Sequence, residues 1–382
     1  MIVQNTKFIK SYFDKTNTII LFAWMLVNGF FLIKNGIVVT GEAGKYISEA
    51  RVFIQEGRPS SSNFWFYFTE IFLLAFSFKL KLGVVFVLII QLLFNLAATF
   101  SFCRILQYLF HKKEVALIGT IILLLNGPYQ EFNTYLQTES LFYSITLIYT
   151  CFLLHIEKLS LKNFVGIIVY LLVTVITRPT GLLFLPATFI YLFYIFFKKM
   201  QLVKKVIFLI SFTFLFFYIL DKALGSGGEL DFLRPFMDEN IICGVSQATH
   251  STINQTLERS NSIYGLFYYI THNFSQFTRL AWLKTLAFFG LYRSYYSVFH
   301  NIFLIIYFSA IHFLAFLGIL YFVKNYMGIL IYLLSIIFLT WMTVILTCDD
   351  WHNRFYLAIS PYVIILGLAG LNRLINISAN SE

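Results

Sequence analysis

Charged residues are scarce in this sequence. They make up 12% of its 382 residues, while hydrophobic residues make up 59%. A soluble domain usually contains about 25% charged residues and about 45–50% apolar ones. The excess of apolar side chains excludes a water-soluble enzyme, a disordered regulator and a free nucleic-acid-binding protein. The composition therefore predicts an all-α polytopic membrane protein.

Acidic residues and cysteines are also few. The chain has 18 Asp and Glu against 28 Lys and Arg, for a net charge of +10. The lysines gather in short loops between apolar runs, which is the pattern of membrane topology, so we interpret the net charge as setting orientation rather than as binding a polyanion. The four cysteines, Cys103, Cys151, Cys243 and Cys348, have neither CxxC nor metal-ligand spacing, and the first two fall inside apolar runs. We therefore expect no disulfide framework.

Long apolar runs are what the sequence has in abundance. A helix needs about 20 apolar residues to cross a bilayer, within a range of about 17–25. Ten runs meet this requirement and predict about ten transmembrane helices, near 18–38, 83–109, 114–130, 139–156, 162–178, 181–198, 204–222, 300–323, 327–347 and 355–373. One further apolar stretch, 63–80, is interrupted by Glu70 and flanked by Lys79 and Lys81.

The positive-inside rule decides how the stretch 63–80 is placed. If it lies flat in the interface, every later lysine-rich short loop falls on the cytoplasmic side; if it crosses, all of them fall outside. We therefore predict an interfacial segment, both termini in the cytoplasm, and outer polar segments at 39–62, 223–299 and 348–354. Within the long one, the amphipathic stretch 263–298 predicts surface helices.

This topology predicts three parts of the chain. Residues 1–222 form an N-terminal transmembrane catalytic module, 223–299 an outer-face loop region, and 300–382 the C-terminal transmembrane helices. The compact build and composition are typical of a bacterial protein of the inner (cytoplasmic) membrane.

Two acidic residues follow or precede spans on the predicted outer face. Glu42 lies just after the first span, between glycines, where it is either a helix cap or a general base at the membrane surface. Glu139 opens the fourth span, where an acid also stabilises the helix through its macrodipole.

Basic residues also mark the outer face. Arg178 ends the fifth span, where it is either an interfacial residue that reaches toward water or a clamp for a phosphate. The segment Cys348-Asp349-Asp350-Trp351-His352-Asn353-Arg354 opens the last span. It is a charge cluster that supports an outer site, a divalent-metal site, or a solvated turn, and the residue spacing leaves all three open.

The order of these features resembles the C superfamily of lipid-carrier-dependent membrane glycosyltransferases. Within it, the similarity is to the group of protein mannosyltransferases and lipid A aminoarabinose transferases. Glu42 and Tyr46 match an acid and a Tyr after the first span, although the family usually has Asp there. Further matches are an apolar surface helix that ends at a Gly (63–83), Thr138-Glu139-Ser140 at the fourth span, Arg178-Pro179-Thr180-Gly181, and His352-Asn353-Arg354-Phe355 before the last span.

The resemblance implies inverting transfer of a sugar from a polyprenyl-phosphate carrier to an acceptor hydroxyl on the outer, periplasmic face. It implies Glu42 as the general base and Arg178, Arg354 and His352 as the groups that bind the donor phosphate. Substrate positioning would fall to Tyr46, Glu139 and Asp350. The acceptor is a glycan, lipid or protein, no nucleic acid is involved, and no cofactor other than a divalent metal is considered.

Two other functions stay open. A polysaccharide polymerase or ligase also uses lipid carriers, and it would concentrate arginines in the large outer loop, where Arg234, Arg259, Arg279 and Arg293 lie. A flippase for lipid-linked glycans would show ionisable residues in the middle of spans; Arg104 is the one such candidate, near the cytoplasmic end of its span.

Overall fold

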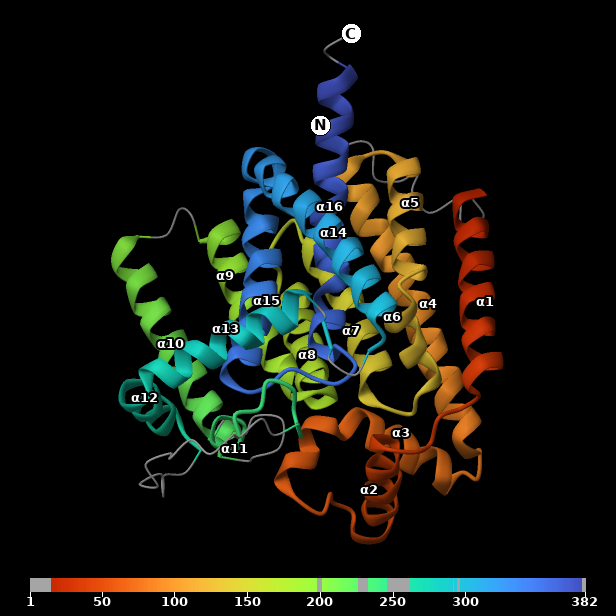
Figure 1. Ribbon diagram of the computed structural model, residues 1–382, viewed down its shortest axis with the longest axis vertical. Helices are drawn as coiled ribbons and strands as arrows, with labels where there is room; N and C mark the ends of the chain where they lie inside the picture. Colours follow the sequence, from red (N-terminus) through yellow and green to blue (C-terminus); the bar gives the residue numbers. More distant parts are fainter. Residues whose placement is uncertain are drawn as a thin grey trace. The chain divides into compact units, whose positions relative to one another are not determined.

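The chain is all-helical throughout its described part. The computed structural model (Figure 1) describes residues 15–197, 201–225, 233–245, 261–290, 292–293 and 296–379. Within these ranges it contains α- and 3-10 helices and no β-strand, apart from two isolated backbone bridges. The predicted all-α polytopic fold class is confirmed.

Seven helices in the described ranges are long and apolar enough to cross a membrane. The protein is thus an integral, multi-pass membrane protein. These helices are α1 (Lys15–Asn35), α4 (Gly83–Phe110), the continuous pair η3 (Pro179–Leu183) and α9 (Phe184–Phe196), α10 (Leu202–Leu224), α14 (Val298–Asn325), α15 (Met327–Leu346) and α16 (Arg354–Ala379).

The other three predicted spans take a different form. Helices α7 (Thr138–Leu154) and α8 (Leu161–Thr177) have 17 residues each, at the lower limit for a span. The run 114–130 is broken into two helical pieces, bent by 66° relative to each other. The first piece is α5 (Lys113–Leu124), and the second is α6 (Gly127–Glu131) continued by η2 (Phe132–Thr134). Pro128 explains the break, because proline has no N–H to continue the α5 hydrogen bonds and favours the first turn of a new helix.

The apolar stretch 63–80 forms no helix of spanning length. It divides into η1 (Ser62–Tyr67) and the twelve-residue α3 (Phe68–Lys79). Neither is among the helices that can cross a membrane, as expected for a segment that does not cross. Its place in the headgroup layer stays a prediction.

The chain forms two compact units. Unit 1 comprises residues 1–58 and 69–157, and unit 2 comprises 59–68 and 158–382. The three-part division of the sequence analysis is based on the predicted membrane topology, whereas these two units are based on contacts within the chain. The three-part division stays a prediction.

Polar side chains join the helices of unit 1. Asn133 of η2 donates to Asn28 of α1 (2.8 Å) and accepts from Ser140 of α7 (2.7 Å). The Trp24 indole N–H donates to Asn95 of α4 (2.7 Å). These hydrogen bonds hold the helices of unit 1 together, because lipid offers the polar side chains no other partner. Helix α2 (Glu42–Glu56) follows α1 and ends at Gly57 in the left-handed conformation.

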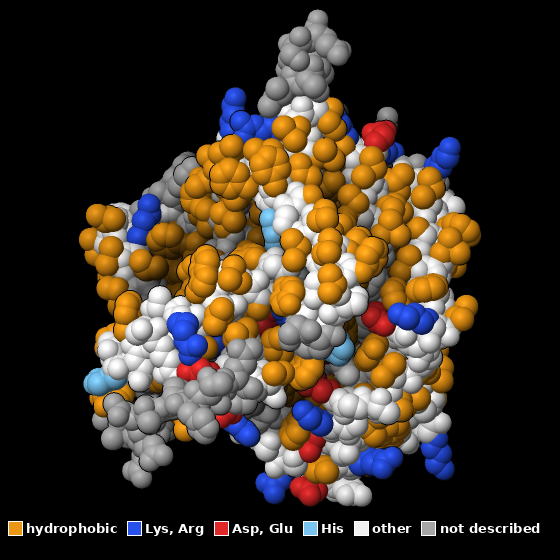
Figure 2. Space-filling view, viewed as in Figure 1, with side chains coloured by type: hydrophobic (Ala, Val, Ile, Leu, Met, Phe, Trp, Pro, Cys, Tyr) orange, Lys and Arg blue, Asp and Glu red, His pale blue; other side chains and the backbone are white. Residues whose placement is uncertain are grey.

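Unit 2 contains one very close helix crossing, between α14 and α16. A Cβ atom on Gly318 would overlap the carbonyl oxygen of Leu366, and one on Gly370 would overlap that of Leu314. Small residues allow such close backbone contact in membranes, where packing rather than hydrophobicity drives helix association. Figure 2 shows hydrophobic side chains covering the outward flanks of the helices, as expected for surfaces that face lipid.

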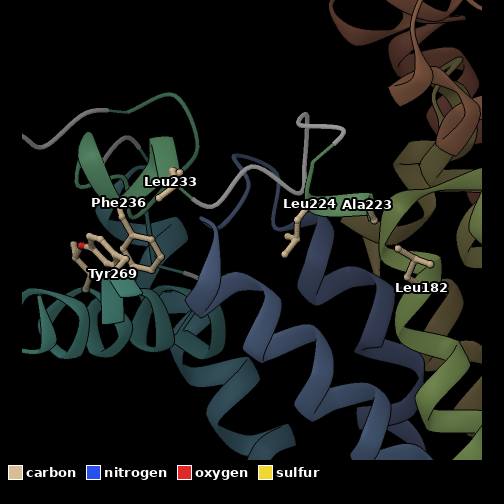
Figure 3. Close-up of a cluster of buried hydrophobic side chains, with 7 residues drawn as sticks. Leu182, Ala223, Leu224, Leu233, Phe236 and Tyr269 are labelled. Atoms are coloured by element: carbon tan, nitrogen blue, oxygen red, sulfur yellow. The ribbon is translucent and has the colours of Figure 1, made fainter. Parts of the chain in front are cut away.

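The predicted surface helices between α10 and α14 are confirmed as helices: α12 (Ile263–His272) and α13 (Phe274–Gly290), preceded by α11 (Leu233–Met237). The Ser262 hydroxyl caps α12 by accepting from Gly265 N–H. These helices bury a hydrophobic cluster together with the end of α10 and with η3 (Figure 3). It contains Leu182, Ala223, Leu224, Leu233, Phe236, Tyr269 and Leu280. The cluster therefore joins α11, α12 and α13 to the segment that directly follows Arg178.

Candidate functional site

The turn between α15 and α16, residues 347–353, is held by a disulfide and by several hydrogen bonds. Cys348 forms a disulfide with Cys243, from the segment after α11. Asp349 pairs along its backbone with the same segment, donating to Ile241 O (2.8 Å) and accepting from Cys243 N–H (2.8 Å). The Trp351 indole N–H donates to Cys243 O (2.7 Å). The turn is therefore bound to the segment that follows α11.

The expectation that the chain has no disulfide is wrong. The two cysteines of the Cys243–Cys348 disulfide are 105 residues apart and belong to different connecting segments. A pair so distant in sequence is brought together only by the tertiary fold. Cys103 and Cys151, the two inside apolar runs, are free thiols as expected.

Arg293 and Asp349 form an ion pair that is fully buried, with 0% exposure of both side chains. Arg293 Nη2 donates to Asp349 Oδ2 (2.6 Å) and to the carbonyl oxygen of Asp350 (3.1 Å). Two charges leave water here, which costs free energy unless hydrogen bonds compensate each ion. Asp349 Oδ1 is compensated by the N–H of Asp350 (2.8 Å).

Asp350 binds the first residue of α16. Its Oδ2 accepts from Arg354 Nη2 in a short ion pair, and its Oδ1 accepts from the backbone N–H of His352 (3.1 Å). Asn353, between them, has a φ of +56°, so the chain turns sharply before the helix begins. The turn thus places an arginine at the start of α16, with a carboxylate beside it.

Arg178 belongs to the same cluster. It ends α8 in extended conformation, is 3% exposed, and lies 5.9 Å from the centre of the Phe355 ring. Gly181, three residues on, has no room for a Cβ, which would overlap the carbonyl oxygen of Thr174. The close contact fixes the path of the chain after Arg178.

The two aspartates differ in their acidity. Burial raises the pKa of Asp349 to about 6, although the charge and hydrogen bond of Arg293 act in the opposite direction. Burial alone would also raise the pKa of Asp350. There the charge and hydrogen bond of Arg354, the N–H of His352 and the charge of Arg178 outweigh it, so the pKa is lower than usual. Asp350 is therefore ionised at neutral pH, and its charge interacts with the guanidinium groups of Arg354 and Arg178.

A buried lysine fixes the beginning of the turn. Lys284 of α13 donates through Nζ to the carbonyl oxygens of Thr347 (2.6 Å) and Ile345 (3.3 Å) at the end of α15. The ammonium group also lies 4.0 Å from the centre of the Phe236 ring. Burial lowers the pKa of Lys284 to about 7. This lysine therefore joins α13 to the turn that carries the aspartates.

His352 lies on the surface, with an exposed side chain. In the part of the chain that the structure describes, no three His, Cys, Asp or Glu side chains gather into a group that could hold a metal ion. The carboxylates of Asp349 and Asp350 are instead bound to arginines. These contacts form a charge cluster, and its support of an outer site stays a prediction.

The remaining predicted residues lie in unit 1. Glu42 is the first residue of α2, partly exposed, with Lys45 Nζ 3.8 Å from its Oε1. Tyr46 follows one helical turn later and is buried. A separation of four residues puts both side chains on the same face of α2.

Glu139, in the first turn of α7, is fully buried and has a carboxyl neighbour that the sequence did not suggest. Glu70 of α3 is likewise fully buried, and neither of its carboxyl oxygens has a hydrogen-bond partner within the described residues. Burial, and after it the charge of Glu139, raises the pKa of Glu70 well above its usual value. Two buried carboxyl groups therefore lie close enough to influence each other, Glu70 on α3 and Glu139 on α7.

The structure therefore brings together Arg178, Asp350 and Arg354, with His352 joined through its backbone, in unit 2. Glu42, Tyr46 and Glu139 belong to unit 1. Sequence reasoning missed the buried ion pair of Arg293, which it considered among the arginines of the large loop 223–299. The one available signal was an arginine close to a span, which requires a partner when buried.

Comparison with known proteins identifies no relative. No family model matches the chain, and no curated protein or solved structure is significantly similar to it.

Proposed function

We propose that this protein is a membrane glycosyltransferase that moves a sugar from a polyprenyl-phosphate carrier to an acceptor hydroxyl. The observation that carries the proposal is the cluster of Arg178, Asp350 and Arg354 at the ends of two helices of unit 2. Together with Arg293 and Asp349 it contains three guanidinium groups and two carboxylates. One positive charge is in excess, which suits an anionic ligand.

A phosphate is the anion that this chemistry favours. Guanidinium groups bind phosphate oxygens through two parallel hydrogen bonds. Positioned positive charge in a site of low dielectric constant also stabilises a departing phosphate, and this is often the largest contribution to catalysis. The apolar helices beside the cluster provide the environment that a polyprenyl chain requires.

The acceptor needs a base, and Glu42 is the residue we assign to it. The acceptor oxygen forms a bond to the anomeric carbon while the bond from that carbon to the phosphate oxygen breaks. The electron pair leaves with the phosphate, and the acceptor proton goes to the carboxylate. General-base assistance contributes about 10²–10⁴-fold. Tyr46 and Glu139 would position the sugar or the acceptor.

The disulfide supports an outer-face site. Stable disulfides form in oxidising compartments such as the bacterial periplasm and are rare in the cytoplasm. Cys243 and Cys348 lie in the two segments that the positive-inside rule assigns to the outer face. We therefore propose a periplasmic site on a protein of the bacterial inner membrane.

The test is transfer of labelled sugar by membranes that contain the protein. A panel of polyprenyl-phosphate sugars is supplied, and label is followed into protein, glycan and lipid fractions. We expect transfer by the wild type and a loss of at least about 100-fold in Arg178→Gln, since removal of one charged donor typically costs about 10²–10³-fold. Arg58→Gln, on an exposed side chain, is the control. Wild-type membranes that transfer nothing from any donor would refute the proposal.

A polysaccharide polymerase or ligase is the second candidate. It is favoured by Arg293, an arginine of the long outer segment that reaches the cluster. Two other arginines of that segment are paired with acids, Arg234 with Asp238 and Arg279 with Glu239, and Arg259 lies outside the described residues. The size of the product distinguishes the candidates: one added sugar indicates a transferase, and a block or ladder of repeats indicates a ligase or polymerase.

A further inference from the structure

Arg293 is buried in the short connection between α13 and α14, and both terminal nitrogens of its guanidinium group donate to other parts of the protein, while Nε has no partner within the described residues. Nη1 donates to the carbonyl oxygens of Ala287 (3.0 Å) and Tyr292 (2.9 Å). Nη2 donates to Asp349 and to the carbonyl oxygen of Asp350. The side chain therefore has the contacts of a residue that holds other groups in place, not of one that binds a ligand directly.

The backbone of Arg293 is fixed as well. Its N–H donates to Asn301 Oδ1 (3.1 Å), and its carbonyl oxygen accepts from Asn301 Nδ2 (2.9 Å). Asn301 belongs to the first turn of α14 and is buried. The backbone that carries the guanidinium group is thus bound to the first turn of α14.

A continuous chain of hydrogen bonds leads from Arg293 to the phosphate-binding arginine that we propose. Arg293 holds Asp349, and Asp349 accepts the N–H of Asp350. The carboxylate of Asp350 in turn binds Arg354. Arg293 also donates to the carbonyl oxygen of Asp350. It therefore positions the Asp350 backbone in two ways, directly and through Asp349.

We infer that Arg293 is a positioning residue of the phosphate site: it fixes Asp350, and through Asp350 it fixes the guanidinium of Arg354. This inference rests on the proposed function. Loss of Arg293 leaves Asp349 as an uncompensated buried acid next to the cluster. Asp349 then competes with the phosphate for Arg354, or the turn moves to expose it to water. Either response weakens binding of an anion.

The test measures anion binding by the purified full-length protein in detergent, with farnesyl phosphate as the probe. Four forms are compared: wild type, Arg293→Gln, Arg293→Lys, and the double variant Arg293→Met/Asp349→Leu. The double variant replaces the buried pair by apolar side chains, which is often neutral or favourable for stability. Arg234→Gln is the matched control, since this exposed arginine between α10 and α14 pairs with a partly exposed acid, Asp238.

We expect Arg293→Gln to bind at least tenfold more weakly and to unfold at a lower temperature, with Arg293→Lys between it and the wild type. The double variant should regain the unfolding temperature and still bind at least tenfold more weakly. A double variant with wild-type affinity would overturn the inference, because Arg293 would then serve stability alone.

The same experiment separates this inference from the proposed function. If the wild type binds farnesyl phosphate and the variants behave as expected, yet no sugar is transferred, the positioning role stands and the transferase fails. If transfer occurs and the double variant binds normally, the transferase stands and the positioning role fails. Wild-type protein that binds no farnesyl phosphate overturns both.

Discussion

Cys243 and Cys348 lie 5.2 Å apart, Cα to Cα, and join the segment after α11 to the turn between α15 and α16 across 105 residues. The second of these segments continues directly into Asp349, Asp350 and Arg354, so the disulfide and Arg293 constrain the same turn. The long segment between α10 and α14 is thereby part of the phosphate site that we propose and not only a cover for it.

The first prediction concerns this disulfide. Closing a loop of about 100 residues is worth about 4–5 kcal/mol in the chain-entropy model. The double variant Cys243→Ser/Cys348→Ser should therefore unfold at a clearly lower temperature and bind farnesyl phosphate more weakly. Wild-type protein treated with a thiol reductant should behave in the same way, while Cys151→Ala should not. A double variant with the thermal stability and affinity of the wild type would contradict the assignment.

The second prediction concerns pH. The pKa of Asp349 is raised to about 6 in the folded protein, against about 4 when unfolded, so the folded state retains the proton over this range. Its contribution to stability is fully present below pH 4 and is lost as the pH rises through 6.

The difference between wild type and Asp349→Asn measures this contribution. As the pH rises from 4 to 7, the free energy of unfolding of the wild type should fall by about 2–3 kcal/mol relative to Asp349→Asn. Unfolding temperatures in detergent across this range provide the measurement, with the partly exposed Asp238 as control in Asp238→Asn. A constant difference, or one of opposite slope, would show that Asp349 does not titrate in this way.

The third prediction concerns the crossing of α14 and α16. Gly370→Ala places a Cβ on the Leu314 carbonyl oxygen, so the helices must separate. Overpacking costs about 1–3 kcal/mol, more than the roughly 1 kcal/mol that alanine gains over glycine in a helix. Gly367→Ala, on the same helix, meets only ordinary contacts at 3.7 Å and beyond. We expect a fall in unfolding temperature for the first variant and none for the second; equal behaviour would contradict the crossing.

The fourth prediction concerns Gly181. Gly181→Ala pushes the 178–181 segment away from Thr174 and so displaces Arg178. Farnesyl phosphate should bind at least about tenfold more weakly, since loss of about 1.4 kcal/mol of interaction has this effect. The control is Gly44→Ala in α2, where a Cβ meets nothing within 4 Å. Unchanged affinity in a folded Gly181→Ala protein would remove Arg178 from the site.

Much of the fold follows from hydropathy because each span is a local property of the sequence. The run 83–109 became α4 with almost the predicted ends, and 63–80 formed no spanning helix. The break in 114–130 could have been expected from Gly127-Pro128. It was missed because apolar composition alone does not register the hydrogen bond that proline removes.

The site was less accessible to sequence reasoning. Arg178 was selected because a charged residue at a span end is costly without a partner. The roles of Asp350 and Arg354 were expected from the resemblance, and in the structure both lie near Arg178. Arg293 and Cys243 lie in the long segment between α10 and α14, where partners depend on contacts with distant residues. Glu70 was seen only as an interruption of an apolar run, since its neighbour Glu139 lies on another helix.

The most direct test of the account is sugar transfer by Glu42→Gln. The substitution keeps the size of the side chain and removes the carboxylate that we assign as the base, so farnesyl phosphate binding should stay at the wild-type level. Transfer of label from the polyprenyl-phosphate sugar should fall by about 10²–10⁴-fold. Transfer at the wild-type rate by a folded Glu42→Gln protein would contradict the proposed mechanism.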